Sequence, residues 1–196
     1  EKEYNSGLGS NGLTSARHDV LHKYYAESYP ETFEPALKDN VVYIGKHKMT
    51  DKMNVEGRET TVGKLLLSPT RTYAPVLKVL LEENFDAIHG LIHCSGGGQT
   101  KCMKYVPGGL SIVKDNLFTP PVIFDLIQQS SNAPAREMYQ VFNMGCRLEI
   151  YTPEKDAEAV MEVAGRYGIA SQVIGRVVRS ARQELIIQTK EGELKY

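Results

Sequence analysis

The sequence is short of tryptophan, cysteine and long apolar runs, and each shortage excludes a class of protein. It contains no tryptophan and three cysteines, Cys94, Cys102 and Cys146. Three thiols are too few for a disulfide framework and no CxxC pair occurs, so we expect reduced cysteines and a cytoplasmic protein. No apolar run approaches the roughly 20 residues that a membrane-spanning helix needs.

An excess of one charge is also missing. Lysine and arginine number 23 and aspartate and glutamate number 24, which gives a net charge of −1. A nearly neutral chain lacks the general basic field that attracts nucleic acid or an anionic membrane, so we expect neither partner. The 196 residues, of which 41% are hydrophobic, are enough for one substantial domain or two very small ones.

The sequence begins EKEYNSGLGSNG, without methionine and already rich in turn residues. We therefore expect a fragment that spans one domain, residues 1–196, and that lacks an N-terminal part. Any site shared with that part would be only half present.

The chain does contain alternating helix and strand patterns. Apolar residues at helical spacing predict helices over 13–27, 71–84, 99–105, 120–130, 134–142 and 153–168. Aliphatic runs predict strands over 87–93, 110–115, 144–152, 171–179 and 184–189. Residues 29–64 are the least core-like, and we expect a long excursion with a strand-like VVYIG and a small hairpin. The order predicts an α+β fold, layered α/β/α, with a mixed β-sheet and ferredoxin-like β-α-β-β features.

One glycine-rich turn, HCSGGGQTK at 93–101, lies between a predicted strand and a predicted helix. Glycines allow backbone N–H groups to approach an anion, and a following helix adds its positive N-terminal dipole. The order Gly-Gln-Thr-Lys is not that of a Walker P-loop, and the spacing is not that of a dinucleotide fingerprint. The turn either binds a phosphate or gives a helix start the flexibility it needs, and the sequence alone leaves both open.

Polar residues at predicted helix starts and strand ends are further candidates. The GSNG turn precedes a helix that Ser10 or Asn11 could cap. Thr70 is a natural cap for the next helix. Arg71, just inside that helix, could pair with a phosphate or carboxylate, or form a surface ion pair. His93 ends a strand beside the glycine turn, where it could meet a substrate or be hydrogen-bonded within the fold.

Metal binding has little support in the sequence. His18 and His22 lie four apart on a predicted helix, which permits chelation, but such a pair more often sits on a solvated face. His89 and His93 lie four apart in a strand, which is too far for them to bind one ion easily. We therefore predict no metal site.

Four strings occur in a fixed order and together span most of the chain. They are GLGSNG at 7–12, SPTRTY at 68–73, IHCSGGG at 92–98 and EMYQVFNMG at 137–145. In these strings the chain resembles the C-terminal domain of the aminoimidazole ribonucleotide synthetase family, also called phosphoribosylformylglycinamidine cyclo-ligases. Ser95 stands where that family usually has threonine, and Cys94 stands at a usually apolar position. Residues 38–64 are longer than the family pattern, and we interpret them as an insertion without an assigned function.

The resemblance implies the C-terminal domain fold of that superfamily and an enzyme of purine biosynthesis. ATP would activate the formyl oxygen of formylglycinamidine ribonucleotide, a substrate nitrogen would attack the formyl carbon, and phosphate would leave as the imidazole ring closes. ATP and Mg²⁺ would be bound mostly by the missing N-terminal domain, and the full-length enzyme would be a homodimer. This chain would form one wall of the substrate cleft and would be inactive alone.

The resemblance also implies roles for individual residues. His93 and Asn143 would orient the reacting amidine or its oxygen. Residues of the two turns and of the PTR segment would hold the substrate phosphate: Ser10, Asn11, Gly12, Thr70, Arg71, Ser95, Gly96, Gly97 and Gly98. Two alternatives are a non-catalytic regulatory or dimerising module of the same fold, and a related ATP-dependent enzyme such as selenophosphate synthetase or thiamin monophosphate kinase.

Overall fold

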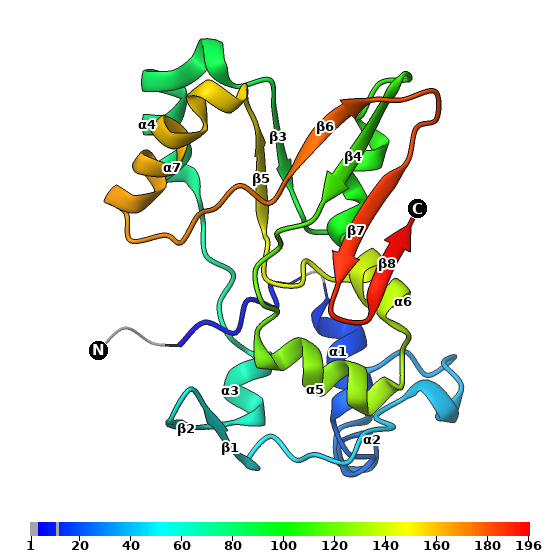
Figure 1. Ribbon diagram of the computed structural model, residues 1–196. Helices are drawn as coiled ribbons and strands as arrows, with labels where there is room; N and C mark the ends of the chain where they lie inside the picture. The colour runs from blue at the N-terminus through cyan, green and yellow to red at the C-terminus, as the bar shows by residue number, and fades with distance from the viewer. Residues whose placement is uncertain (1–3, 11) are drawn as a thin grey trace. The chain divides into compact units, whose positions relative to one another are not determined.

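The computed structural model describes residues 4–10 and 12–196, which form two compact units (Figure 1). Unit 1 contains the described part of Glu1–Thr70 together with Ser95–Gln99 and Thr119–Gly145. Unit 2 contains Arg71–Cys94, Thr100–Phe118 and Cys146–Tyr196. Each unit is thus assembled from segments that are far apart in the sequence. Within the described ranges, no helix has the length and apolar character needed to cross a bilayer.

Unit 1 is mostly helical. Its helices are α1 (Leu13–Val20), α2 (Tyr24–Ser28), α3 (Val62–Leu66), α5 (Val122–Ser131) and α6 (Ala135–Val141), with short 3-10 turns η1 (Pro30–Thr32) and η2 (Asp39–Val41). α1 contacts α3 and α5, and α5 contacts α6. The apolar faces of these helices bury Val20, Leu65, Phe124 and Met138. Full burial of such a side chain contributes roughly 1.5–3 kcal/mol, so these contacts hold the unit together.

The helix predicted over 13–27 is interrupted. α1 ends at Val20, and Leu21 is extended, with ψ of 146°. The backbone N–H of His22 donates to the carbonyl of His47 at 2.9 Å, so the chain pairs here with a distant segment before α2 begins. The single-helix prediction was wrong because this pairing outweighs the helical spacing of the apolar residues.

The segment 38–64 contains the predicted small hairpin. Strands β1 (Lys52–Val55) and β2 (Arg58–Thr61) form it and pair antiparallel. The VVYIG stretch bends instead of forming a strand, yet Val42 and Tyr43 within it are buried. Most residues of 29–64 are nevertheless exposed or half-buried, which agrees with the expectation that this segment is the least core-like. The interpretation of residues 38–64 as an insertion stays a prediction.

In unit 2, two helices cover one face of a two-stranded sheet (Figure 1). β3 (Gly90–His93) pairs antiparallel with β5 (Leu148–Tyr151). Helices α4 (Ala74–Asn84) and α7 (Ala157–Arg166) contribute the buried residues of the cluster, and both strands pack against it. The cluster residues are Val76, Leu80, Val160 and Val163, with Leu91 of β3 and Ile150 of β5 against them.

The other face of this strand pair is partly polar. Successive strand residues point to opposite faces, so Ile92 and Glu149, which are paired in register, lie on the face away from α4 and α7. Both residues are buried. A carboxylate on a buried strand face needs partners within the fold, and it has them, as described below.

Unit 2 also contains a four-stranded mixed sheet. Its strands are β6 (Gly175–Arg179), β4 (Leu110–Lys114), β7 (Leu185–Thr189) and β8 (Gly192–Lys195), in that order across the sheet. β4 runs parallel to β7, whereas the β4–β6 and β7–β8 pairs are antiparallel. Three short 3-10 helices, η3 (Phe85–Ala87), η4 (Gly98–Lys104) and η5 (Glu154–Asp156), complete the elements of the described chain.

The α+β class and the mixed sheet are confirmed. The layered α/β/α arrangement with ferredoxin-like β-α-β-β features is not confirmed. The strands on either side of α7 do not pair with each other, because β5 pairs with β3 while β6 pairs with β4. Strand order depends on contacts between distant segments, which the local pattern does not encode.

Candidate functional site

The first and second strings are joined in unit 1. The backbone N–H of Ser10 donates to Thr70 Oγ1 at 2.9 Å. Closer to the N-terminus, the Asn5 amide donates to the carbonyl of Pro69 at 2.7 Å, and the N–H of Ser6 donates to Ser68 Oγ at 3.1 Å. The GLGSNG loop is thus held along the segment that leads to Thr70.

These contacts correct the predicted helix caps. α1 begins after Gly12 without a side-chain cap, so Ser10 does not cap it, and Asn11 lies outside the described residues. α4 begins at Ala74, four residues after Thr70, and therefore Thr70 is not its cap. Thr70 accepts a hydrogen bond from the loop instead.

Asn143 connects the fourth string to the first. Its amide nitrogen donates to the carbonyls of Gly7 at 2.9 Å and Leu8 at 3.2 Å. Its amide oxygen accepts from the N–H of Gly145 at 2.8 Å. The residue is only 5% exposed, so its side chain is used to fasten the loop to the end of α6. The predicted role in orienting a reacting amidine stays a prediction.

The glycine turn is also hydrogen-bonded to Asn143. Gln99, which is fully buried, donates from Nε2 to the carbonyl of Asn143 at 2.6 Å. Gly98 has φ of +48°, and a Cβ there would lie 2.4 Å from the carbonyl oxygen of Phe142. Its N–H donates to the carbonyl of Ser95 within the turn at 3.1 Å. Gly98 is therefore required by packing, whereas Ser95, Gly96 and Gly97 are partly exposed and can meet a ligand.

His93 lies in unit 2, at the end of β3, with an exposed side chain. The Tyr73 ring meets its imidazole edge-on, with ring centroids 6.2 Å apart. Partial burial lowers the pKa of His93 below its usual value, and the cations Arg147 and Lys101 lower it further. The imidazole is therefore neutral at pH 7 and can accept a proton.

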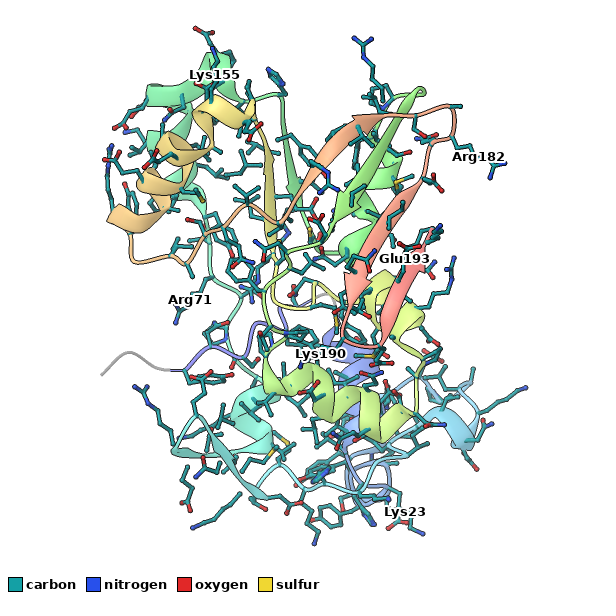
Figure 2. All side chains as sticks on the ribbon, in the orientation of Figure 1. Lys23, Arg71, Lys155, Arg182, Lys190 and Glu193 are labelled. Atoms are coloured by element: carbon teal, nitrogen blue, oxygen red, sulfur yellow. The ribbon has the colours of Figure 1, made fainter. Side chains whose placement is uncertain are left out.

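Arg71 was predicted to lie just inside the second helix. This prediction is wrong, because α4 begins only at Ala74 and Arg71 precedes it. Its side chain is exposed, and Figure 2 shows it pointing away from the ribbon. An exposed guanidinium next to Thr70 in the chain remains suited to an anionic ligand.

A buried ion pair lies in unit 2 and was missed by the sequence analysis. Lys114 Nζ, at the end of β4, lies 2.5 Å from Glu149 Oε1 on β5, and the two side chains are 1% and 3% exposed. The thiol of Cys94 donates to the same oxygen at 3.0 Å, and the hydroxyl of Tyr151 donates to Oε2 at 2.8 Å. Burial is the largest single influence on the pKa of Lys114 and would lower it, but the charge of Glu149, its hydrogen bond and the neighbouring groups together outweigh burial and leave that pKa raised.

The three cysteines are buried and are not joined in disulfides. Burial is the largest cause that raises the pKa of each thiol, and the charge of Glu149 adds to it; for Cys146 the pKa reaches about 12. The thiols are therefore protonated at neutral pH and are poor nucleophiles. They donate to or pack around other groups and do not form a reactive site.

We expect an aromatic disulfide reagent to leave the native chain unmodified at pH 7. All three thiols should react once denaturant unfolds the chain, because unfolding restores both access and an ordinary pKa. Stopped-flow absorbance of the released thiolate against denaturant concentration measures this. Rapid labelling of the native chain without denaturant would contradict the assignment.

The pair His18 and His22 does not form the helical chelating pair that its spacing permitted. α1 ends before His22, and His18 is buried, with its Nδ1 accepting from the N–H of Tyr43 at 3.3 Å. Across the part of the chain that the structure describes, no group of three or more His, Cys, Asp or Glu is placed to hold a metal ion.

Comparison with known proteins agrees with the four strings. A family profile described as AIR synthase related protein, C-terminal domain, matches residues 3–188. The chain is 36% identical over 176 residues to phosphoribosylformylglycinamidine cyclo-ligase of Methanocaldococcus jannaschii, a match covering 89% of this chain and 43% of that protein. It is 35% identical over 187 residues to the protein of the same name from Methanobrevibacter smithii, covering 95% and 48%. The chain thus spans less than half the length of these curated relatives.

Proposed function

Because this chain belongs to the family of AIR synthase related proteins, as a C-terminal domain, we propose that it is part of a phosphoribosylformylglycinamidine cyclo-ligase. The whole protein would close the ring of formylglycinamidine ribonucleotide to give aminoimidazole ribonucleotide, at the expense of ATP, in purine biosynthesis. It would act in the cytoplasm as a homodimer. The shared name of the two relatives supports this proposal over a regulatory module or another ATP-dependent enzyme.

The observation that carries the proposal is the meeting of the motif strings in unit 1. The side-chain amide of Asn143 donates hydrogen bonds to the GLGSNG loop. The backbone carbonyl of Asn143 accepts a hydrogen bond from the side chain of Gln99, which follows the glycine turn. Ser10 binds Thr70 of the second string. Residues that are more than 130 positions apart in the sequence are thus held as one hydrogen-bonded group.

This group offers donors to a phosphate. Thr70 Oγ1 accepts from Ser10, which leaves its own O–H to donate to a phosphate oxygen. Ser95 adds a hydroxyl, and the partly exposed backbone at Gly96 and Gly97 allows an anion to come close. In this proposal Asn143 holds these donors in place through its hydrogen bonds to the GLGSNG loop.

In unit 2, His93 would accept the proton that the amidine nitrogen loses during ring closure. Ring closure forms a bond between the amidine nitrogen and the formyl carbon, and that nitrogen must lose a proton. A neutral imidazole can accept it, and the lowered pKa of His93 keeps the imidazole neutral at pH 7. Tyr73, whose ring meets His93, limits the orientations that the imidazole can adopt.

ATP would supply the phosphoryl group that converts the formyl oxygen into a leaving group. Residues 4–10 and 12–196 offer no cluster of three potential metal ligands, so we assign no Mg²⁺ ligand among them. We propose that ATP and Mg²⁺ bind mostly outside this chain, in the portion of the relatives that it does not cover.

The phosphate assignment predicts a large effect at Gly97. Gly97→Val is expected to weaken binding of formylglycinamidine ribonucleotide at least about tenfold, because a side chain blocks the close approach of the anion. Calorimetric titration of the chain with the ribonucleotide measures this, with ATP titrated in parallel. We expect the wild-type chain to bind the ribonucleotide and not ATP.

Gly109→Val is the matched control for Gly97→Val. Gly109 has φ of +84°, close to the +93° of Gly97, but it lies outside the turn, and a Cβ there would meet no atom within 4 Å. Both variants therefore carry similar backbone strain, and only one alters the turn. Equal binding by the two variants, or no binding of the ribonucleotide by the wild-type chain, would contradict the assignment.

A further inference from the structure

The proposed ring closure leaves one feature of unit 2 unused, which is the network around Glu149. Its carboxylate accepts from the Lys114 ammonium, the Cys94 thiol and the Tyr151 hydroxyl. Ionised carboxylates accept only, so these three donors leave the group well satisfied. A buried polar network whose members are all paired specifies one arrangement of the elements that carry them.

Within unit 2, the network is connected to His93 through Cys94, the next residue in the chain. The N–H of Cys94 donates to the carbonyl of Arg147 at 2.7 Å, which extends the β3–β5 pairing by one residue. The thiol of Cys94 donates to Glu149 from the same residue. Cys94 is therefore fixed by its backbone and by its side chain, and His93 precedes it directly in the chain.

We propose that Glu149, held by Lys114, is a positioning residue that fixes the end of β3 through the Cys94 thiol and thereby fixes the His93 imidazole. The inference rests on the proposed role of His93 in ring closure. Neither Glu149 nor Lys114 touches a reacting atom in this scheme. Their part is to hold the backbone from which the imidazole projects.

Stability alone does not explain such a pair. Removing two charges from water is costly, and well-packed apolar residues in place of a buried ion pair are often neutral or stabilising. An apolar pair would give no acceptor for the Cys94 thiol, however, and the Cys94 side chain would then no longer help to hold the end of β3. The Lys114–Glu149 pair is therefore better explained by its effect on the position of the end of β3 than by a gain in stability.

The position of the His93 imidazole can be followed by NMR, because a neighbouring aromatic ring and two neighbouring charges affect its signals. The Tyr73 ring meets it edge-on at 6.2 Å between centroids, and the charges near it belong to Arg147 and Lys101. Movement of the imidazole away from these groups changes both the ring-current shift of its Hε1 proton and the pH at which it titrates. NMR measures both quantities on the chain without any ligand.

The experiment compares His93 in the wild type, in Cys94→Ala and in Cys94→Ser. His93→Gln assigns its signal among the five histidines. In the wild type we expect His93 to titrate below its ordinary pKa, because partial burial and then the charges of Arg147 and Lys101 lower that pKa. Cys94→Ala should raise that pKa toward its ordinary value and change the Hε1 shift. Cys94→Ser, which keeps a donor for Glu149, should restore most of both.

Two further variants separate positioning from loss of packing. Lys114→Met/Glu149→Leu removes the network without leaving a charge and should move His93 as Cys94→Ala does. Val163→Ala weakens the cluster that α4 and α7 form and should leave the His93 titration unchanged. An unchanged His93 in Cys94→Ala, equal shifts in the alanine and serine variants, or an equal shift in Val163→Ala would overturn the proposal. Because no ligand is used, failure here is distinct from failure of ribonucleotide binding.

Discussion

Glu149→Leu is expected to lower the free energy of unfolding by about 3–5 kcal/mol, because it leaves the Lys114 ammonium buried without its anion. The variant also removes the acceptor for the Cys94 thiol and the Tyr151 hydroxyl. A urea titration followed by far-UV circular dichroism measures the loss. This is the largest effect that we expect from any single substitution in unit 2.

The double variant Lys114→Met/Glu149→Leu is the control that isolates the unpaired charge. Both side chains then become apolar, so we expect stability within about 1–2 kcal/mol of the wild type. Glu59→Leu removes a partner from an exposed pair, in which Lys52 Nζ lies 3.0 Å from Glu59 Oε1, and should cost less than about 1 kcal/mol. Equal losses in the single and double variants would show that the charge of Lys114 is not the cause.

The pH dependence of this pair has a definite sign. The pKa of Lys114 is raised in the folded chain, so the folded state binds its proton more tightly than the unfolded state does. The stabilisation is therefore complete below pH 10.5, the ordinary lysine value, and is lost as the pH rises through the higher folded value. Between pH 6 and pH 9 the difference between wild type and double variant should stay constant.

Local pattern was sufficient for most strands and for helices α4 and α7 of unit 2. The predicted strands over 87–93, 110–115 and 144–152 contain β3, β4 and β5, because alternation and aliphatic content are properties of neighbouring residues. The same reasoning failed at Leu21, where a hydrogen bond between His22 and the distant His47 ends the helix. Pairing between distant segments leaves no mark on local spacing.

The residues of the candidate site likewise fall into those that the sequence identifies and those that only the fold identifies. The four strings were recognisable in the sequence, and His93 and the glycine turn were identified with them. Gln99, Tyr73 and Arg147 were not assigned roles, because what they contact depends on the fold. Lys114 and Glu149 were missed because a charged residue in a strand is usually taken to face solvent. Only the pairing of β3 with β5 shows that Glu149 faces inward.

The second large effect is expected at Gly98, where we predict that Gly98→Ala destabilises unit 1 by about 2–5 kcal/mol. Two causes combine. The residue has φ of +48°, which strains any side chain, and the new Cβ would lie 2.4 Å from the carbonyl oxygen of Phe142 and 2.8 Å from that of Tyr139. Both obstacles are backbone atoms at the end of α6, so neither can rotate away.

Gly57→Ala separates the two causes within the same unit. Gly57 has φ of +80° in the β1–β2 hairpin, and a Cβ there would meet no atom within 4 Å. Its alanine variant carries the backbone strain alone and should lose only about 1 kcal/mol. Thermal unfolding of both variants, followed by circular dichroism, gives the difference that is due to the contact with α6. Equal losses would mean that the turn does not press on α6.

The same contact connects stability to binding. Asn143 lies one residue beyond Phe142, and its amide holds the GLGSNG loop through the carbonyls of Gly7 and Leu8. A side chain at Gly98 that pushes on Phe142 must therefore disturb the loop and the Ser10–Thr70 contact as well. In Gly98→Ala, ribonucleotide affinity should fall together with stability, whereas in Gly57→Ala affinity should stay at the wild-type value. Calorimetry on the two variants, at a temperature where both are folded, tests whether the turn acts through Asn143.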